Sequence, residues 1–418
     1  MQLTQERSWV SAQIGAREHY AIPKALQDGG RLERLYTEYW AGAPVRWATR
    51  LTGLSVLSTL STRWCQDLDR QTRIVSWNCR TLRREFLARA RRRSCHPPDG
   101  SPYVEFINTG RWFAESICKD LKQRPLPSGT IFFAYDTGSL EVFEHLQDKR
   151  VRTVVGQMDP SRVETSLVQE EERRWPGWST VNREVPEAYF ARREKEWALA
   201  DRVMVNSEFS RSALLQQGVS AEKLVVVPLC YDAPAGRPGR PAPAAPRPLR
   251  VLYLGQVILR KGIQYLVEAG KLLKHEPVQF DVVGPIGITE EAVRSAPSHV
   301  TFHGRARRDQ VADWYSRAHV FVLPTISDGF AITQIEAMAH GLPVISTPNC
   351  GEVVTDGVDG FLVPVRDANA LAEAVLRYVK EPGLLASQRE AAIAKSREFS
   401  LAHLQRNLLR VEESLLKA

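Results

Sequence analysis

Short apolar runs alternate with amphipathic segments along the second half of the chain. The runs are four to six residues long, which is typical of buried strands, and the segments between them place apolar residues three or four positions apart, as helices do. Strands and helices that alternate in this way indicate a parallel sheet with right-handed crossovers. The pattern predicts strands at 250–255, 278–283, 300–304, 320–324 and 343–346, and helices at 263–273, 310–317 and 333–340.

The first half shows the same alternation less regularly. It predicts strands at 9–14, 73–77, 130–135, 151–156, 202–205 and 224–228, and helices at 19–27 and 139–149. Two open α/β sheets of this kind bind ligands at the carboxyl ends of their strands, so we expect a cleft between two domains.

A proline-rich segment separates the two halves. Residues 233–249 carry a proline every two to four positions, which predicts a stiff, extended linker. The sequence therefore predicts two Rossmann-like doubly wound domains, at 1–232 and 250–390. Leucines at helical spacing in 391–418 predict a helical tail that closes the second domain or crosses back over the cleft.

Composition narrows the class of protein. Of the 418 residues, 43% are hydrophobic and 25% are charged, which excludes a disordered or collagen-like chain. The six cysteines form no C-x-x-C pair, and no apolar stretch reaches the roughly 18 residues of a spanning helix. We expect a cytoplasmic protein without a zinc site or signal peptide. Its net charge of +8 favours anionic partners, among them phosphorylated small molecules and anionic lipids.

A basic loop follows the predicted strand 250–255. Gly255 and Gly262 flank Arg260 and Lys261, directly before a predicted helix. Glycine allows close backbone approach, and the two cations lie where a diphosphate would meet a helix N-terminus. A solvated basic loop explains the same residues equally well.

Two acids mark the next candidate segment. Asp328 precedes the predicted helix 333–340, and Glu336 lies inside it among small residues, about two turns further along the same side. Packing does not explain a carboxylate in the middle of such a helix. The backbone N–H groups expected to point at an anion from its start belong to Phe330, Ala331 and Ile332.

Together these segments resemble a known family. Their order is similar to that of the nucleotide-sugar-dependent retaining glycosyltransferases of family four, which have the GT-B fold. The resemblance covers residues 197–380 closely and the first 190 residues only loosely. The motifs that carry it are Gly255 to Gly262, Asp328-Gly329-Phe330, Glu336-Ala337-Met338-Ala339, Gly341-Leu342-Pro343-Val344-Ile345, Gly351-Glu352, Asp356-Gly357 and Gly360-Phe361-Leu362-Val363.

The resemblance implies a role for each matching residue. Arg260 and Lys261 would hold the donor diphosphate and stabilise it as the leaving group. Glu336 would bind the ribose hydroxyls, and Asp328 would contact the donor sugar. The remaining donor-binding positions that it implies are Gly15, Gly255, Gly304, Arg305, Gly329, Phe330, Ala331 and Ile332. Because cations and helix-end amides can stabilise a leaving diphosphate without a metal, we expect no metal and no other cofactor.

Three positions depart from the family pattern. Asp328 stands where most members have Glu, which draws the carboxylate back by roughly 1.5 Å. Asp159, after the strand 151–156, stands where the family often has His, and we expect it to take that polar role. The loop after the first strand keeps one glycine, Gly15, instead of two. In this loop Glu18 and His19 are candidates for contact with the acceptor or the sugar, and a capping or solvated role for His19 stays equally open.

The sequence says less about the acceptor. Aromatic residues at 36, 39, 40 and 47 and six arginines between 83 and 93 predict that the first domain docks on an anionic membrane, where lipid-linked acceptors lie. Core aromatics and a solvated basic helix are the other interpretation. The arginines accompany no nucleic-acid-binding motif. We therefore expect an enzyme at the inner face of the membrane that glycosylates a hydroxyl acceptor in polysaccharide, glycolipid or glycoconjugate synthesis.

Two other functions stay open at this point. Asp328 and the missing His are also compatible with a nucleotide-sugar-binding scaffold subunit that does not turn over. A phosphorylase of the same fold would require a pyridoxal-binding lysine pocket, of which the sequence shows no sign. The base and the sugar of the donor are left undecided.

Overall fold

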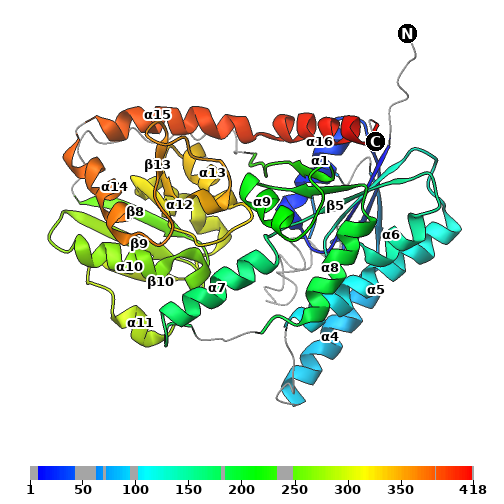
Figure 1. The fold of residues 1–418 in the computed structure, drawn as a ribbon, viewed down its shortest axis with the longest axis horizontal. Helices are drawn as coiled ribbons and strands as arrows, with labels where there is room; N and C mark the ends of the chain where they lie inside the picture. The colour runs from blue at the N-terminus through cyan, green and yellow to red at the C-terminus, as the bar shows by residue number, and fades with distance from the viewer. Residues whose placement is uncertain are drawn as a thin grey trace, which may run out of the picture.

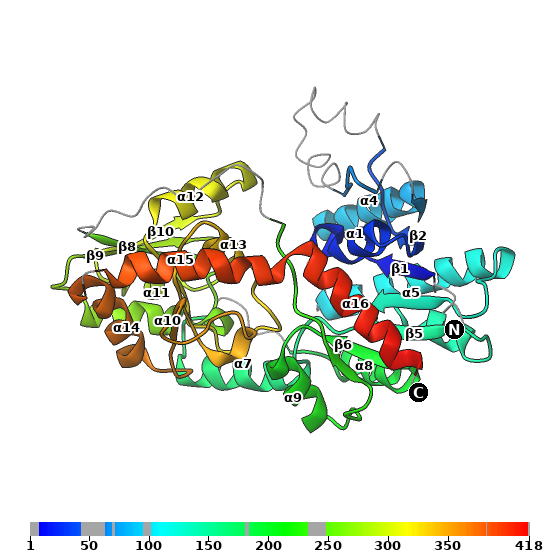
Figure 2. The same ribbon diagram turned by 90° about the horizontal axis from the view of Figure 1, so that it is seen from above.

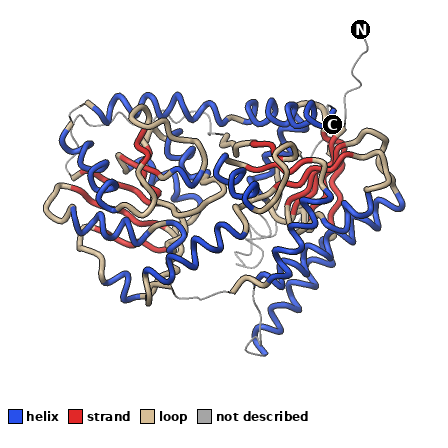
Figure 3. Tube along the Cα trace, in the orientation of Figure 1, coloured by secondary structure: helices blue, strands red, loops and turns tan. Residues whose placement is uncertain are grey.

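The computed structural model describes residues 8–42, 63–68, 72–94, 102–179, 184–232, 248–381 and 383–416. Their strands form two sheets, one on each side of the proline-rich segment, and each sheet is flanked by helices (Figures 1 and 3). All strand pairs within both sheets are parallel. This confirms the predicted α/β class with two doubly wound domains. The predicted linker lies outside the described residues up to position 247.

The first sheet has seven strands in the order β3-β2-β1-β4-β5-β6-β7. Most side chains of its central strands are buried, because helices cover both faces. Its strands are β1 Trp9–Gln13, β2 Leu32–Thr37, β3 Arg73–Ser76, β4 Ile131–Tyr135, β5 Arg152–Gly156, β6 Arg202–Val205 and β7 Leu224–Val226.

The second sheet has six strands in the order β10-β9-β8-β11-β12-β13. Five of its strands agree with the predicted ranges to within one residue at each end, and β8 begins at Leu249, the last position of the predicted linker. The sixth strand, β13, was not predicted. The strands are β8 Leu249–Leu254, β9 Val278–Val283, β10 Val300–Gly304, β11 Val320–Leu323, β12 Val344–Ser346 and β13 Gly360–Leu362.

In each sheet the strand order reverses at one strand. In the first sheet β1 lies between β2 and β4, and in the second sheet β8 lies between β9 and β11. Loops that leave such a switch point diverge to opposite faces of the sheet, and ligands of doubly wound folds bind in the crevice between them. The loops after β8 and β11 are those that carry Arg260, Lys261 and Asp328.

Helices pack around both sheets. Those of the first half are α1 Ala21–Asp28, α4 Asn78–Ser94, α5 Pro102–Gln123, α6 Leu140–Leu146, α7 Arg162–Arg174, α8 Glu187–Leu199 and α9 Glu208–Gln216. Those of the second half are α10 Ile263–Leu272, α11 Glu290–Arg294, α12 Val311–Arg317, α13 Ile332–Ala339, α14 Ala368–Lys380, α15 Leu384–Ser396 and α16 Leu401–Leu416.

The helical tail crosses back to the first domain. Helix α15 packs on α13 and α14, the chain then bends at residues 397–400, and α16 packs on α1 (Figures 1 and 2). The leucines of its buried side join the core beneath β1. Trp9 and Arg31 of the first domain both donate hydrogen bonds to Glu412 of α16. Of the two courses predicted for the tail, the structure shows the crossing.

One segment of the first half packs on the second domain. Glu171 of α7 accepts hydrogen bonds from Gln264 (2.8 Å) and Tyr265 (3.0 Å) of α10. The backbone continues this contact, because Thr289 donates a hydrogen bond to the carbonyl of Trp178. In Figure 1, α7 runs beneath α10 from the first domain toward the second.

The aromatic residues expected to dock on a membrane lie in the core. The sequence pattern did not predict β2, and Tyr36 of this strand is fully buried. Tyr39 and Trp40, which follow the strand, are buried as well. The prediction that these aromatics contact lipid is therefore wrong, and Trp47 lies outside the described residues.

Candidate functional site

The basic loop is fixed beside the carboxyl end of β11. Gly262 has φ +74°, and a Cβ at this position would overlap the carbonyl oxygen of Pro324, so only glycine fits. The carbonyl of Arg260 accepts hydrogen bonds from the backbone N–H of Ile326 (2.9 Å) and the hydroxyl of Thr325 (3.1 Å). The loops after β8 and β11 therefore form one unit.

Both cations of this loop face carboxylates. Lys261 forms an ion pair with Asp328, and Nη1 of Arg260 lies 3.7 Å from the same side chain. Nη1 of Arg260 also lies 3.3 Å from Glu164 of α7. Burial, with the adjacent Arg260 cation, lowers the pKa of Lys261 to about 7. The structure thus brings Arg260, Lys261 and Asp328 together, as the sequence predicted.

Helix α13 presents an anion-binding end and a carboxylate. In the described part of the chain, the N–H groups of Phe330, Ala331 and Ile332 meet no hydrogen-bond acceptor. Glu336, one turn further, accepts a hydrogen bond from the hydroxyl of Tyr315 (2.8 Å). Burial raises the pKa of Glu336, and the Tyr315 hydroxyl opposes that rise.

Glycines allow the nearby loops to meet. A Cβ on Gly284 would overlap the carbonyl of Gly255, so the turns after β8 and β9 touch only because Gly284 lacks a side chain. Gly304 ends β10 with φ +69°, and Arg305 after it is exposed. These three glycines and Arg305 lie at the carboxyl edge of the second sheet, beside the basic loop.

The first domain lies directly against this site. A Cβ on Gly329 would overlap the carbonyl oxygen of Met158, which follows β5. The ring of His19 lies 3.3 Å from the guanidinium of Arg308, across the two domains. Asp328, Gly329 and His19 therefore lie where the two domains meet, as the predicted cleft requires.

Backbone strain concentrates on the facing edge of the first sheet. Glu18, His19 and Tyr20 have positive φ values after β1, as do Thr137 after β4 and Ser161 after β5. Such conformations are costly for residues other than glycine and cluster at functional sites. Burial raises the pKa of Glu18 to about 7. Gly15, at φ +79°, donates its N–H to Glu38.

Asp159 is held by its own domain. Its carboxylate accepts hydrogen bonds from Arg193 (2.7 Å) and from the backbone N–H of Ser161 (2.8 Å). Burial raises the pKa of Asp159, but the charge of Arg193, the hydrogen bonds from Arg193 and Ser161 and the charge of Arg260 together bring it below its usual value, so the carboxylate stays ionised. Arg193 is itself buried and pairs with Asp136 as well. The side chain of Asp159 is one-third exposed.

The comparison with known families decides the identity of the second half. Residues 248–381 match the family Glycosyl transferases group 1. This segment is a glycosyl transferases group 1 domain. It contains every second-domain residue predicted from the motifs, from Gly255 to Glu336.

Curated relatives agree with this assignment. The chain is 31% identical over 212 residues to the D-inositol 3-phosphate glycosyltransferase of Streptomyces bingchenggensis, over 44% of this chain and 47% of the relative. It is 28% identical over 219 residues to the amylovoran biosynthesis glycosyltransferase AmsK of Erwinia amylovora, over 48% of this chain and 53% of the relative. The chain spans about half the length or less of the curated relatives it matches first.

Solved structures extend the likeness to the whole fold. Sucrose-phosphate synthase from Thermosynechococcus elongatus superimposes with a TM-score of 0.64 at 19% identity, over 98% of this chain and all of that one. Anabaena Alr3699/HepE in complex with UDP gives 0.62 at 14%, over 97% and 100%. At these identities the likeness concerns the fold, and it confirms GT-B for the two domains together.

Several residues that shape the candidate site were not predicted from the sequence. Glu164, Arg193 and Arg308 carried no motif, and their partners lie between 34 and 289 positions away. Tyr315, which holds Glu336, likewise lies 21 residues before it. The charged character of α7 was visible, but its approach to Arg260 depends on how the two domains pack.

Glu352 contacts the first domain. Its carboxylate accepts hydrogen bonds from the N–H of Glu208, at the start of α9. Asp356 accepts from the N–H of Leu362 and shapes the turn before β13. These two acids of the resemblance therefore serve the domain contact and a turn.

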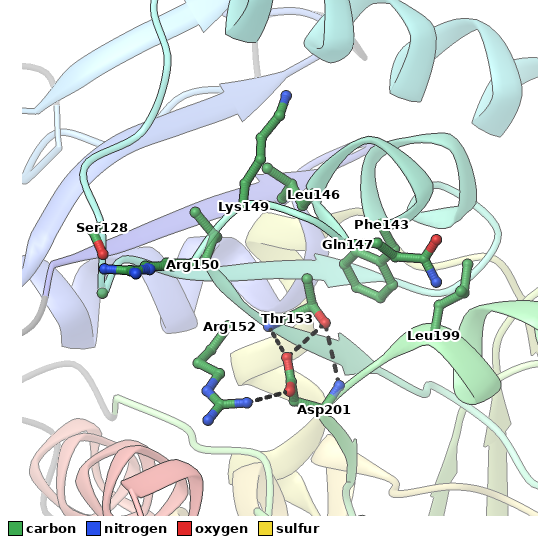
Figure 4. A pocket seen from close by; sticks show the side chains of 12 residues that line it. Ser128, Phe143, Leu146, Gln147, Lys149, Arg150, Arg152, Thr153, Leu199 and Asp201 are labelled. Carbon is green, nitrogen blue, oxygen red and sulfur yellow. Dashed lines mark hydrogen bonds and ion pairs between the residues drawn. The ribbon is translucent and has the colours of Figure 1, made fainter.

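A large surface pocket lies at the other edge of the first sheet. It measures about 460 Å³ and is lined by residues at the amino ends of β4, β5 and β6, among them Gly129, Arg152 and Asp201 (Figure 4). Asp201 pairs with Arg152 (2.9 Å) and accepts the N–H of Thr153 (2.7 Å). Because these residues lie at the amino ends of the strands, the pocket is remote from the candidate site.

The described residues contain neither a metal-ligating cluster nor a membrane-spanning helix. In the described ranges, no three His, Cys, Asp or Glu side chains converge in a way that could hold a metal ion. None of the described helices is both long enough and apolar enough to cross a membrane.

Proposed function

We propose that this chain transfers a sugar, with retention of configuration, from a nucleoside diphosphate sugar to a hydroxyl acceptor. One observation carries the proposal. Arg260, Lys261, the unpaired backbone N–H groups of 330–332 and Glu336 lie together at the switch point of a glycosyl transferases group 1 domain. UDP in a structural relative supports a nucleoside diphosphate as the leaving group.

The arrangement suits departure of a diphosphate. Negative charge develops on the phosphate as the bond to the anomeric carbon breaks, and Arg260, Lys261 and the amides at the start of α13 stabilise that charge. Glu336 binds the ribose hydroxyls and fixes the nucleoside. The acceptor hydroxyl attacks from the side of the leaving group, and a phosphate oxygen takes its proton. Asp328 and Asp159 hold the donor sugar in this scheme.

Binding and hydrolysis of donors test the proposal. Uridine, guanosine and adenosine diphosphate sugars are screened by thermal shift, since a bound donor raises the melting temperature by mass action. The donor that binds is then followed for release of its nucleoside diphosphate. Slow release supports transfer, binding without release favours the scaffold function, and no binding by any of the three contradicts both.

The cation pair also carries a proposal about cofactors. Because Arg260 and Lys261 supply the positive charge, turnover is independent of divalent ions. Activity that survives EDTA supports this, and activity restored only by Mg²⁺ or Mn²⁺ contradicts it.

For the partner of the first domain we propose an anionic bilayer. Leu82, Phe86 and Leu87 of α4 are exposed, and Phe86 is 73% exposed. The exposed arginines Arg80 and Arg83 lie beside them. Apolar side chains between cations are typical of helices that bind anionic interfaces. In Figure 1 the helix lies at the lower end of the first domain, the domain that we propose receives the acceptor.

Vesicle flotation tests this contact. The full chain should float with phosphatidylglycerol vesicles and not with phosphatidylcholine vesicles, and Phe86→Ser should reduce flotation severalfold. Leu272→Ser, at an exposed leucine of the second domain, is the matched control. Equal flotation with both lipids, or no effect of the Phe86 change, contradicts the proposal.

A further inference from the structure

Helix α7 carries three carboxylates to the second domain. Glu170 and Glu171 both pair with Arg366, which precedes α14, at 2.7 and 2.5 Å. Glu171 is fully buried and also accepts the hydrogen bonds from Gln264 and Tyr265. These contacts fix the helix on the second domain, although its sequence precedes the linker.

The third carboxylate belongs to Glu164, at the start of α7, and forms an ion pair with Arg260. Its Oε2 is 3.3 Å from Nη1 of Arg260 and accepts a hydrogen bond from the hydroxyl of Ser327 (3.1 Å). The same Nη1 donates to the carbonyl of Ser327 (3.0 Å). Because Arg260 and Ser327 belong to the loops after β8 and β11, Glu164 touches both walls of the switch point.

We propose that Glu164 is an internal counterion that competes with the donor diphosphate for Arg260. The inference rests on the proposed function and deepens it, because it assigns a residue that weakens retention of the nucleoside diphosphate. The carboxylate occupies hydrogen-bonding positions that a phosphate oxygen would take.

The charges around the site support competition. Lys261 pairs with Asp328, and Arg260, 3.7 Å from the same carboxylate, is the cation with which Glu164 pairs. An incoming diphosphate must share Arg260 with this carboxylate and meets its negative charge a few ångströms away, in a part-buried site where screening by water is reduced. A nucleoside diphosphate therefore binds more weakly than the two cations alone would allow, and the product leaves more readily.

The anchoring of α7 makes this charge a constant part of the site. The pairs with Arg366 and the hydrogen bonds from α10 lie on the same domain as Arg260. Glu164 therefore stays with the donor loops through contacts that do not involve the first sheet.

Calorimetric titration with UDP tests the inference. Glu164→Gln keeps the shape and the hydrogen bond from Ser327 but removes the charge, and we expect UDP to bind about tenfold tighter, a change of roughly 1.4 kcal/mol. Glu170→Gln is the matched control, because this carboxylate lies on the same helix and pairs with Arg366 and not with Arg260. Its affinity for UDP should equal that of the wild type.

A structural role would give the opposite result. If Glu164 only supports the fold of the loops, Glu164→Gln binds UDP equally or more weakly, which overturns the inference. Glu164→Ala, which also removes the charge, serves as a second variant if the glutamine variant does not fold. In steady-state kinetics with the donor found by the screen, KM for the donor should fall while kcat does not rise, since tighter product binding slows release.

The two failures are separable. Should wild-type chain bind none of UDP, GDP and ADP, the proposed function fails and the counterion fails with it. If the wild type binds one of them and Glu164→Gln does not tighten that binding, only the counterion is overturned.

Discussion

Lys261 shows how burial changes the chemistry of a single basic residue. An ordinary lysine keeps its proton far above neutral pH, but burial with the Arg260 cation lowers the pKa of Lys261 to about 7. Protonation of this group therefore changes within the physiological range, and the charge available to a diphosphate changes with it.

We predict that UDP binding weakens as the pH rises from 7 to 9. Below the lowered pKa Lys261 is charged and attracts the diphosphate; above it the neutral amine does not, so the affinity should fall by up to about tenfold per pH unit. Lys261→Arg keeps its charge and should give a flat profile over the same range. Calorimetry at constant ionic strength measures both, and a flat wild-type profile contradicts the lowered pKa.

Glu336 should contribute to nucleoside binding and not to diphosphate binding. Removing a charge-assisted hydrogen bond costs about 1.5–3 kcal/mol, so Glu336→Ala should weaken UDP binding about 10- to 150-fold and abolish most turnover, as should Lys261→Ala. Inorganic pyrophosphate separates the two: Glu336→Ala should bind it as the wild type does, and Lys261→Ala should not. Near-wild-type rates in both variants would contradict the site.

At the scale of elements, the loops after β8 and β11 act as one because Gly262 lets them meet. Its positive φ value and the carbonyl of Pro324 exclude any side chain. Helix α10 begins directly after this glycine, so the position of the helix start and that of the two cations depend on the same residue.

We predict that Gly262→Ala abolishes UDP binding. The methyl group must move either the basic loop or the β11 loop, which separates Lys261 from Asp328. Gly30→Ala is the control, since Gly30 also has a positive φ (+66°) but has open space around it, and it should cost only about 1–2 kcal/mol of stability. Chemical denaturation and UDP titration measure both effects. Retained binding in Gly262→Ala would show that the loops adapt.

The sequence predicted the second sheet well because its strands are short apolar runs separated by clear helical periods. Strand β2 was missed for a physical reason: Leu32-Glu-Arg-Leu-Tyr-Thr has no regular alternation, and its Arg34 is buried because Asp120, 86 residues later, pairs with it. A partner so distant in the sequence cannot be recognised from the residues around Arg34. The same holds for Arg193, whose charge is buried against two acids.

The candidate site also contains residues that the sequence predicted and residues that it did not. Arg260, Lys261, Asp328 and Glu336 were predicted because each lies within a compact motif. Glu164 meets Arg260, and His19 meets Arg308, only through domain packing, which no local spacing encodes.

At the scale of the whole molecule, α16 joins the two domains by its apolar side. Leu404, Leu408, Val411 and Leu415 are buried against the first domain, and Glu412 holds Trp9 and Arg31. Helix α16 thus completes the core of the first domain.

We predict that Leu408→Ala lowers the free energy of unfolding by about 2–5 kcal/mol, as for other buried leucines. Leu416→Ala, on the same helix but 53% exposed, should change it by less than about 0.5 kcal/mol. Urea denaturation compares the two. Equal effects would mean that α16 does not pack on the first domain.

The course of α7 has a consequence for hybrids made between this chain and its homologues. Residues 162–179 precede the proline-rich segment in the gene, yet Glu171 and Trp178 complete the surface of the other half. A hybrid spliced at 233–247 would bring a foreign helix to Gln264, Tyr265 and Arg366 and leave this polar cluster without its acid. Transfer of an intact second domain between homologues therefore requires two grafts, residues 248–416 and the segment 162–179 that precedes them in the sequence.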